Sequence, residues 1–142
     1  MKTVLYIYLL LLLVSGCKKE DAATEQSVLN VLVGRWELIE QQQGVLGNAS
    51  WRPVQAADRQ VIAFRQDGVL LDSTGVPLCC TARAYIINGQ LFKIIPEESL
   101  LVNSNCDLVD CTFCAVYELE LQAEEFTMTR CSGPKEKYRR LP

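Results

Sequence analysis

The sequence predicts an all-β domain, an antiparallel up-and-down barrel of about eight strands in which short turns link sequence neighbours. Residues 115–122 and 125–130 alternate apolar and polar side chains with a period of two. Asn88-Gly89 and Gln66-Asp67-Gly68 stand between apolar runs, where hairpin turns are expected. Beyond Val33 no long helical period interrupts this pattern. Closure into a barrel is the simplest way for such a meander to remove its edges.

The first sixteen residues are typical of a signal peptide. Lys2 gives a short positive start, and residues 4–14 form an unbroken apolar run. As a helix this run would span about 16 Å, whereas a membrane span needs roughly 20 residues. We therefore expect residues 1–16 to be removed after export rather than to remain as a transmembrane helix.

Val14-Ser15-Gly16-Cys17 resembles the lipobox of bacterial lipoproteins. The resemblance implies cleavage before Cys17 and attachment of lipid to its thiol. Acyl chains anchor a protein stably, because each buried CH₂ contributes about 0.8 kcal/mol. The alternative is a secreted protein with a chance cysteine after its signal.

The residues after Cys17 indicate the membrane to which the protein is sorted. Lys18 replaces the aspartate that retains lipoproteins in the inner membrane, so the resemblance implies the outer membrane. The run 17–21 also resembles the export tag of surface lipoproteins, although an ordinary charged tether reads the same way. We expect residues 17–29 to be a tether, with a short helical turn over 27–33, and residues 30–142 to form the domain.

The strands follow in order along the domain. The first, at residues 35–42, turns Trp36 and Leu38 inward. Later pairs are expected at residues 60–65 with 69–72, 83–87 with 90–95, and 115–122 with 125–130, before a last strand at 137–141. In the third pair, apolar alternation predicts the register Leu121 with Phe126, Leu119 with Met128 and Tyr117 with Arg130.

Gly34-Arg35-Trp36 on the first strand resembles the Gly-X-Trp motif of lipocalins. The order of the segments 32–37, 62–68, 85–89, 117–121 and 138–141 is similar to the short lipocalin-like domains of bacterial lipoproteins. This resemblance implies that Trp36 plugs one end of the barrel beneath a C-terminal arginine. Arg140 is the favoured arginine, because it shares a strand face with Tyr138, and Arg139 is the second choice.

Six cysteines remain once Cys17 carries lipid, and an even number in an oxidising compartment predicts disulfides. The strand register makes Cys114 the diagonal neighbour of Cys131, so these two are expected to pair. Vicinal Cys79 and Cys80 are each expected to reach the Cys106–Cys111 loop. The spacing of Cys106, Cys111 and Cys114 also fits an iron–sulfur or zinc site, which is the alternative to disulfides.

Composition argues against several functions. The net charge is −3 without a basic patch, which argues against nucleic-acid binding. The chain has no histidine, so Ser-His and Cys-His catalytic pairs are excluded. Glu97-Glu98 and Glu124-Glu125 fall at predicted turns, where carboxylates are solvated, and Asp107 with Asp110 lacks the spacing of a calcium loop. We expect neither an enzyme nor a bound cofactor or metal.

Two functions remain. The first is a lipid-anchored barrel that binds a small apolar ligand at its mouth. Its lining would come from inward-facing residues, namely Leu38, Phe64, Tyr85, Tyr117, Leu119 and Met128. The second is a surface interaction protein, such as an adhesin, inhibitor or complex subunit, whose barrel core is solid and whose partner is another protein. In both, the membrane is contacted through the lipid on Cys17.

Overall fold

A computed structural model describes residues 27–44, 48–101, 103–111, 114–131 and 133–142. The expected signal peptide, Cys17 and most of the tether lie outside these residues. None of the described helices is long and apolar enough to cross a membrane. Residues 27–32 are helical, as expected, and short 3₁₀ helices lie at Ala56–Asp58 (η1) and Ser104–Leu108 (η2).

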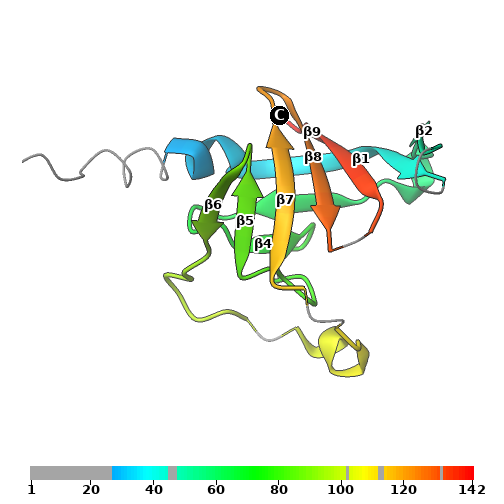
Figure 1. The fold of residues 1–142 in the computed structure, drawn as a ribbon. Helices are drawn as coiled ribbons and strands as arrows, with labels where there is room; N and C mark the ends of the chain where they lie inside the picture. Colours follow the sequence, from blue (N-terminus) through cyan, green and yellow to red (C-terminus); the bar gives the residue numbers. More distant parts are fainter. Residues whose placement is uncertain (1–26, 45–47, 102, 112–113, 132) are drawn as a thin grey trace, which may run out of the picture.

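The described residues form one curled sheet with the order β4-β3-β1-β9-β8-β7-β5-β6, and β2 pairs with the far end of β1 (Figure 1). An all-β architecture was expected and is confirmed. The strands are β1 (Gly34–Gln43), β2 (Ser50–Pro53), β3 (Val61–Phe64), β4 (Leu70–Asp72), β5 (Ala84–Ile87), β6 (Gln90–Lys93), β7 (Val116–Leu121), β8 (Glu125–Arg130) and β9 (Lys135–Arg140).

The sheet departs from an up-and-down barrel at one pair, because β5 and β7 run parallel with Ile87 opposite Leu119. Strand β6 therefore lies at an edge instead of between them. The side chain of Asn88 supports this pairing, since its Oδ1 accepts from the Leu121 amide at 2.8 Å and its Nδ2 donates to the Leu121 carbonyl at 3.3 Å. The expectation of a wholly antiparallel barrel is wrong, because β7 pairs in parallel with β5 and β6 is left at the edge.

The curled sheet stays open between its edge strands, since β4 and β6 do not pair in the described part of the chain. The outer edge of β4 is instead covered by the residues that follow it, because the Leu78 amide donates to the Leu70 carbonyl at 3.2 Å. The fold is thus a half-barrel, and a polypeptide segment rather than a strand pair spans its opening.

The predicted register of β7·β8 and the expected turn between β5 and β6 are confirmed. In β7·β8 the facing pairs are Leu121 with Phe126, Leu119 with Met128 and Tyr117 with Arg130. Asn88 and Gly89 both have positive φ, 49° and 86°, as the tight turn between β5 and β6 requires. Period-two alternation and one turn signal therefore fixed these local pairings correctly.

Trp51 lies on β2, opposite Gln42 of β1, in a strand that the sequence pattern did not predict. Strand β2 has only four residues and ends at Pro53, so it carries no apolar alternation. It forms because β1 extends beyond the part that pairs with β3 and leaves its outer end available.

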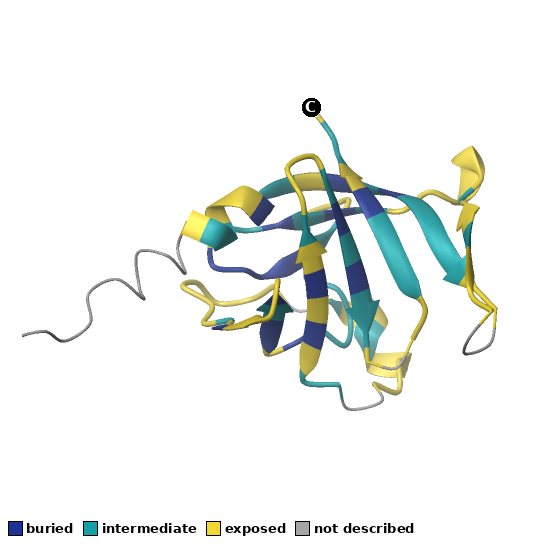
Figure 2. Ribbon diagram, turned by 45° about the horizontal axis from the view of Figure 1, so that its top comes forward, coloured by how far each residue is buried: buried dark blue, intermediate teal, exposed yellow. Residues whose placement is uncertain are grey.

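The core lies inside the curl of the sheet (Figure 2). Five aromatic rings pack edge-on or stacked, with centroids 4.8 Å apart for Trp36 and Phe126 and 4.9 Å apart for Phe126 and Tyr138. Phe64 contacts both Tyr85 and Phe126 at 5.7 Å between centroids. Ring pairs in this range stabilise a core beyond their buried area, and here they link the two halves of the half-barrel.

Candidate functional site

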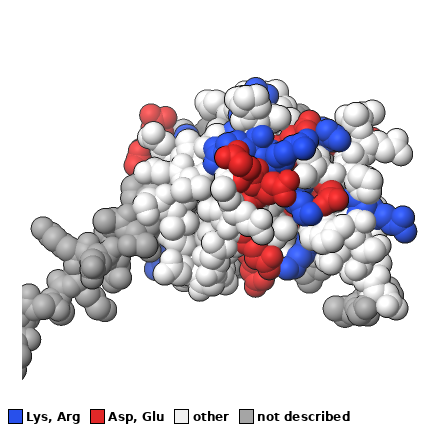
Figure 3. Space-filling view, turned by 90° about the horizontal axis from the view of Figure 1, so that it is seen from above, with Lys and Arg blue, Asp and Glu red and all other residues white. Residues whose placement is uncertain are grey.

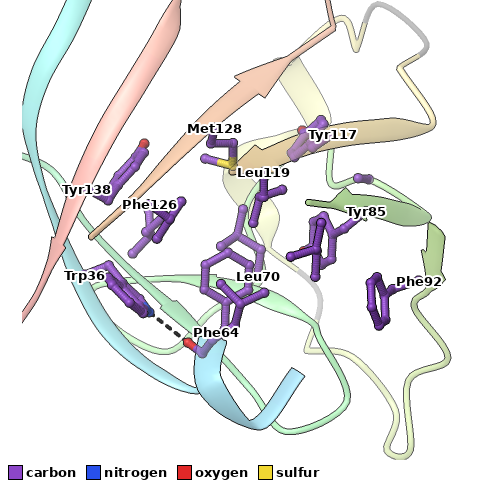
Figure 4. Close-up of a cluster of buried hydrophobic side chains, with 14 of the residues drawn as sticks. Trp36, Phe64, Leu70, Tyr85, Phe92, Tyr117, Leu119, Phe126, Met128 and Tyr138 are labelled. Carbon is purple, nitrogen blue, oxygen red and sulfur yellow. Dashed lines mark hydrogen bonds between the residues drawn. The ribbon is translucent and has the colours of Figure 1, made fainter. Parts of the chain in front are cut away.

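The six residues expected to line a ligand cavity all belong to the packed hydrophobic core. Figure 4 shows five of them there, namely Phe64, Tyr85, Tyr117, Leu119 and Met128. The hydroxyl groups of the two tyrosines among them already have hydrogen-bond partners. The Tyr85 hydroxyl donates to the Gly68 carbonyl at 2.8 Å, and the Tyr117 hydroxyl donates to the Cys80 carbonyl. Burial raises the pKa of both tyrosines, which keeps these phenols protonated as donors. Leu38, Phe64, Leu119 and Met128 are buried with them.

A pocket of about 220 Å³ opens elsewhere, between β4 and the segment that follows β6. Strand β4 supplies Leu70, and the chain before β5 supplies Thr81, Ala82 and Arg83. Val69, Ile94, Pro96 and Leu100 complete the lining. The volume equals roughly seven waters at about 30 Å³ each. None of the expected lining residues belongs to this pocket.

Asp67 holds the segment after β6 against the β3–β4 turn. Only 8% of Asp67 is exposed, and its carboxylate accepts bonds from the Arg65 Nε at 2.9 Å, the Val69 amide at 3.2 Å and the Glu97 amide at 3.0 Å. The hydrogen bonds from Arg65, with those from the Glu97 and Val69 amides, lower the pKa of Asp67 to about 2. A buried carboxylate therefore bridges the open side of the half-barrel.

Two disulfides fasten the same segment further along. Cys79 is bonded to Cys106 and Cys80 to Cys111, with Cα atoms 5.3 Å and 5.2 Å apart. Asn103 adds a polar anchor, because its Nδ2 donates to the Pro77 carbonyl at 3.0 Å while its Oδ1 caps η2 through the Asn105 amide. We call the described residues 95–101 and 103–111 the braced segment, since Asp67 fixes its start and the disulfides fix its end.

Large apolar side chains on the braced segment face solvent. Leu108 is 96% exposed, Ile95 73% and Leu101 68%, and Leu100 and Val109 are exposed as well. Most of the exposed large apolar residues in the described chain therefore belong to this one segment. A loop that is fastened near both ends and still exposes leucines has the character of a binding surface. The pocket adjoins it, because Pro96 and Leu100 belong to both.

The third disulfide joins Cys114 to Cys131, in agreement with the pairing expected from the strand register. Their Cα atoms lie 5.5 Å apart, closer than a flat diagonal pair would allow. An iron–sulfur cluster or zinc site at Cys106, Cys111 and Cys114 would need thiolates, whereas all three sulfurs are disulfide-bonded here. Within the described residues no group of His, Cys, Asp or Glu is arranged to hold a metal ion.

At the other end of the core lies a polar network that the sequence did not reveal. The Arg130 Nη2 donates to the Tyr138 hydroxyl and pairs with the Glu136 Oε2, both at 2.8 Å, and the Tyr138 hydroxyl donates to Glu136 at 2.9 Å. Burial would lower the pKa of Arg130, but Tyr138 and Glu136 outweigh it and raise that pKa. The inward position of Arg130 follows Phe126 and Met128 at period two, which is the signal that could have found it.

The remaining acidic pairs show no catalytic arrangement. Glu97 and Glu98 are exposed, and so is Glu124, while Glu125 is half-buried. Asp107 and Asp110 are exposed on the braced segment.

The chain matches no family model, no curated protein and no solved structure. The candidate site therefore rests on the geometry of the braced segment and its pocket.

Proposed function

We propose that this chain is a lipid-anchored lipoprotein of the bacterial outer membrane whose domain is an interaction module that binds another protein through the braced segment. The observation that carries the proposal is the exposure of Ile95, Leu101 and Leu108 on a segment held by two disulfides. Ordering a loop before binding lowers the entropy cost of association. Exposed leucines on an ordered loop are therefore placed to contact a partner.

The filled interior supports this function over ligand transport inside the barrel. The expected lining residues contact one another, with ring centroids 5.7 Å apart for Phe64 and Tyr85 and 6.4 Å apart for Tyr85 and Tyr117. A ligand in the core would have to displace these rings. The domain is thus better suited to binding at its surface.

The N-terminal sequence supports the anchor. The lipobox-like run before Cys17 and the absence of aspartate at position 18 both favour the outer membrane. The position of Arg140 over Trp36 supports the resemblance to lipocalin-like domains, whereas the parallel β5·β7 pair departs from an up-and-down barrel. The charged run after Cys17 supports exposure on the cell surface, which the proposal includes.

A second candidate function is binding of a small apolar molecule, and the pocket of about 220 Å³ favours it. Its lining is mostly apolar, with Arg83 and Thr81 as polar groups. Typical ligand pockets measure about 300–1,000 Å³, so this pocket would hold only a small molecule or part of a larger one.

Photocrosslinking of the full mature chain in its native cells tests the proposal. A benzophenone amino acid would replace Leu101 or Leu108 on the braced segment, or Leu91 on β6 as an exposed control. We expect a protein adduct at the first two positions and none at Leu91. Native mass spectrometry of the same mature chain covers the alternative, because a stoichiometric small molecule without any protein adduct would indicate the second function instead.

A further inference from the structure

The braced segment combines apolar side chains with negative charge that is largely unpaired. No lysine or arginine occurs between residues 94 and 129, whereas the segment carries Glu97, Glu98, Asp107 and Asp110. All four carboxylate residues are exposed. The charge that the segment itself carries is therefore of one sign, although Arg65 lies beside Glu98 and Arg83 lines the adjoining pocket.

These carboxylates are mostly left without a cation in the described structure. Glu98 lies 3.9 Å from the Arg65 Nη1 and is itself 83% exposed, which makes a weak pair. Among the described residues, no lysine or arginine nitrogen lies within 4.0 Å of the carboxylates of Glu97, Asp107 or Asp110. The negative charge of the segment is thus available to an external partner.

Elsewhere several basic side chains are paired with carboxylates of their own sheet. Lys135 pairs with Glu120 at 2.8 Å, Lys137 pairs with Glu40, and Arg139 lies 3.8 Å from Glu37. Figure 3 shows basic and acidic side chains side by side on that face. The two surfaces therefore differ: charges are paired on that face of the sheet and are largely unpaired on the braced segment.

Apolar and acidic residues are interleaved within the segment. Asp107 and Asp110 bracket Leu108 and Val109, so carboxylates flank the most exposed leucine on either side along the chain. Around η2 the backbone is ordered by the Cys106 amide bonding to the Asn103 carbonyl at 2.9 Å. A complementary surface needs apolar side chains with cations beside them.

We propose that the partner of the braced segment is a protein surface in which lysine or arginine residues flank an apolar patch. The inference rests on the proposed function and adds the chemistry of the partner. Complementary charge specifies the partner and steers its approach. An anionic lipid surface is disfavoured, since it attracts basic segments and repels carboxylates. A second copy of this segment would likewise place carboxylates against carboxylates.

The test extends the photocrosslinking of the full mature chain, with the benzophenone at Leu101 as the probe. The adduct is digested and the crosslinked partner peptide is sequenced by mass spectrometry. We expect lysine or arginine beside apolar residues in that peptide. The double variant Asp107→Asn with Asp110→Asn should lower the adduct yield about threefold to tenfold, as should a rise in ionic strength. Asp107→Glu with Asp110→Glu, which keeps both charges, should preserve the yield.

The other outcomes separate this inference from the proposed function. A protein adduct whose yield is the same in the double asparagine variant, or whose partner peptide is acidic or uncharged, overturns the inference and leaves the interaction module standing. An adduct to lipid or to a second copy of the chain overturns the assigned partner. If no adduct forms at Leu101 or Leu108, the proposed function fails as well.

Discussion

The guanidinium of Arg140 lies over the indole of Trp36, with its Cζ 4.2 Å from the ring centroid, and the two residues face each other across β1 and β9. Arg140 also donates to the carbonyls of Val33, at 3.0 Å, and Val31. The Trp36 Nε1 donates to the Leu32 carbonyl at 2.7 Å (dashed in Figure 4). This pair therefore connects the first strand, β1, and the last strand, β9, to the helix at residues 27–32.

Trp36→Ala is expected to lower the free energy of unfolding by about 3–5 kcal/mol, because Trp36 is fully buried and alanine would leave a cavity. Arg140→Ala should cost about 1–2 kcal/mol through the lost cation–π contact and carbonyl bonds. The double variant should lose less than the sum, since both changes remove one shared contact. Denaturant midpoints of the three variants check this, and full additivity would contradict the assignment.

Trp51→Ala should be much milder than Trp36→Ala. Trp51 is only half-buried on the short strand β2, and its clearest contact is the Lys137 Nζ at 4.8 Å from the ring centroid. An exposed cation–π contact is worth about 0.5–1 kcal/mol. We expect a loss of about 1 kcal/mol by denaturant unfolding. A loss as large as that of Trp36→Ala would mean that β2 contributes far more to the fold than its contacts indicate.

The cysteine pairing predicts that the six domain cysteines of the purified protein carry no free thiol. Peptide mapping without reduction should join Cys114 to Cys131, and should join Cys79 and Cys80 to different partners in the braced segment. The bonds Cys79–Cys106 and Cys80–Cys111 span 27 and 31 residues. Removing either pair should cost about 3–4 kcal/mol by the loop-entropy relation. Stoichiometric zinc or iron with reduced thiols would contradict these pairings.

Lipid attachment is tested at Cys17, which precedes the described residues. Cys17→Ser should abolish labelling by a fatty-acid analogue and release the protein from membranes, because the thiol is the only site of acylation that the lipobox-like run provides. Cys131→Ser serves as a control, since it removes a different cysteine and should leave the label in place. Membrane retention of unlabelled Cys17→Ser would indicate another kind of anchor.

The sequence predicted the local parts of this fold well. Strict alternation gave the register of β7·β8, and from that register came the pairing of Cys114 with Cys131. The Asn-Gly signal gave the β5–β6 turn. The glycine of the Gly-X-Trp motif also has a structural reason, because the φ of Gly34 is +126° and a Cβ there would lie 3.1 Å from the Arg140 Nη1. Each of these features depends on neighbouring residues or on one strand pair.

Non-local features escaped sequence reasoning. The parallel β5·β7 pair joins segments that are distant in sequence, and the hydrogen bonds between Asn88 and Leu121 that accompany it could not be foreseen from either segment alone. The braced segment exposes leucines, whereas sequence reasoning ordinarily assigns apolar residues to the core. Asp67 looked like a polar turn residue, yet the folded chain buries it between Arg65 and Glu97. The candidate site is built from such contacts, so only its cysteines could be found in advance.

The carboxylate of Asp67 makes the braced segment sensitive to acid. Its pKa is about 2 in the folded chain, below its ordinary value of 3.8, chiefly because of the hydrogen bond from Arg65. A depressed folded pKa means that this stabilisation is complete above pH 3.8 and is lost as the pH falls through about 2. At about 1.4 kcal/mol per pKa unit, the contribution is about 2 kcal/mol. Asp67→Asn should therefore lower stability by about this amount at pH 7.

The same variant should also flatten the decline in stability between pH 4 and pH 2, whereas Asp107→Asn, which removes an exposed carboxylate, should leave stability at pH 7 nearly unchanged. Hydrogen exchange at the Glu97 amide gives a local readout, because that amide donates to the Asp67 Oδ2 at 3.0 Å. Protonation of Asp67 weakens this bond, so exchange at Glu97 should rise across that pH window before the β7·β8 amides lose protection. Simultaneous loss at both places would show that Asp67 stabilises the whole domain, with no separate hold on the braced segment.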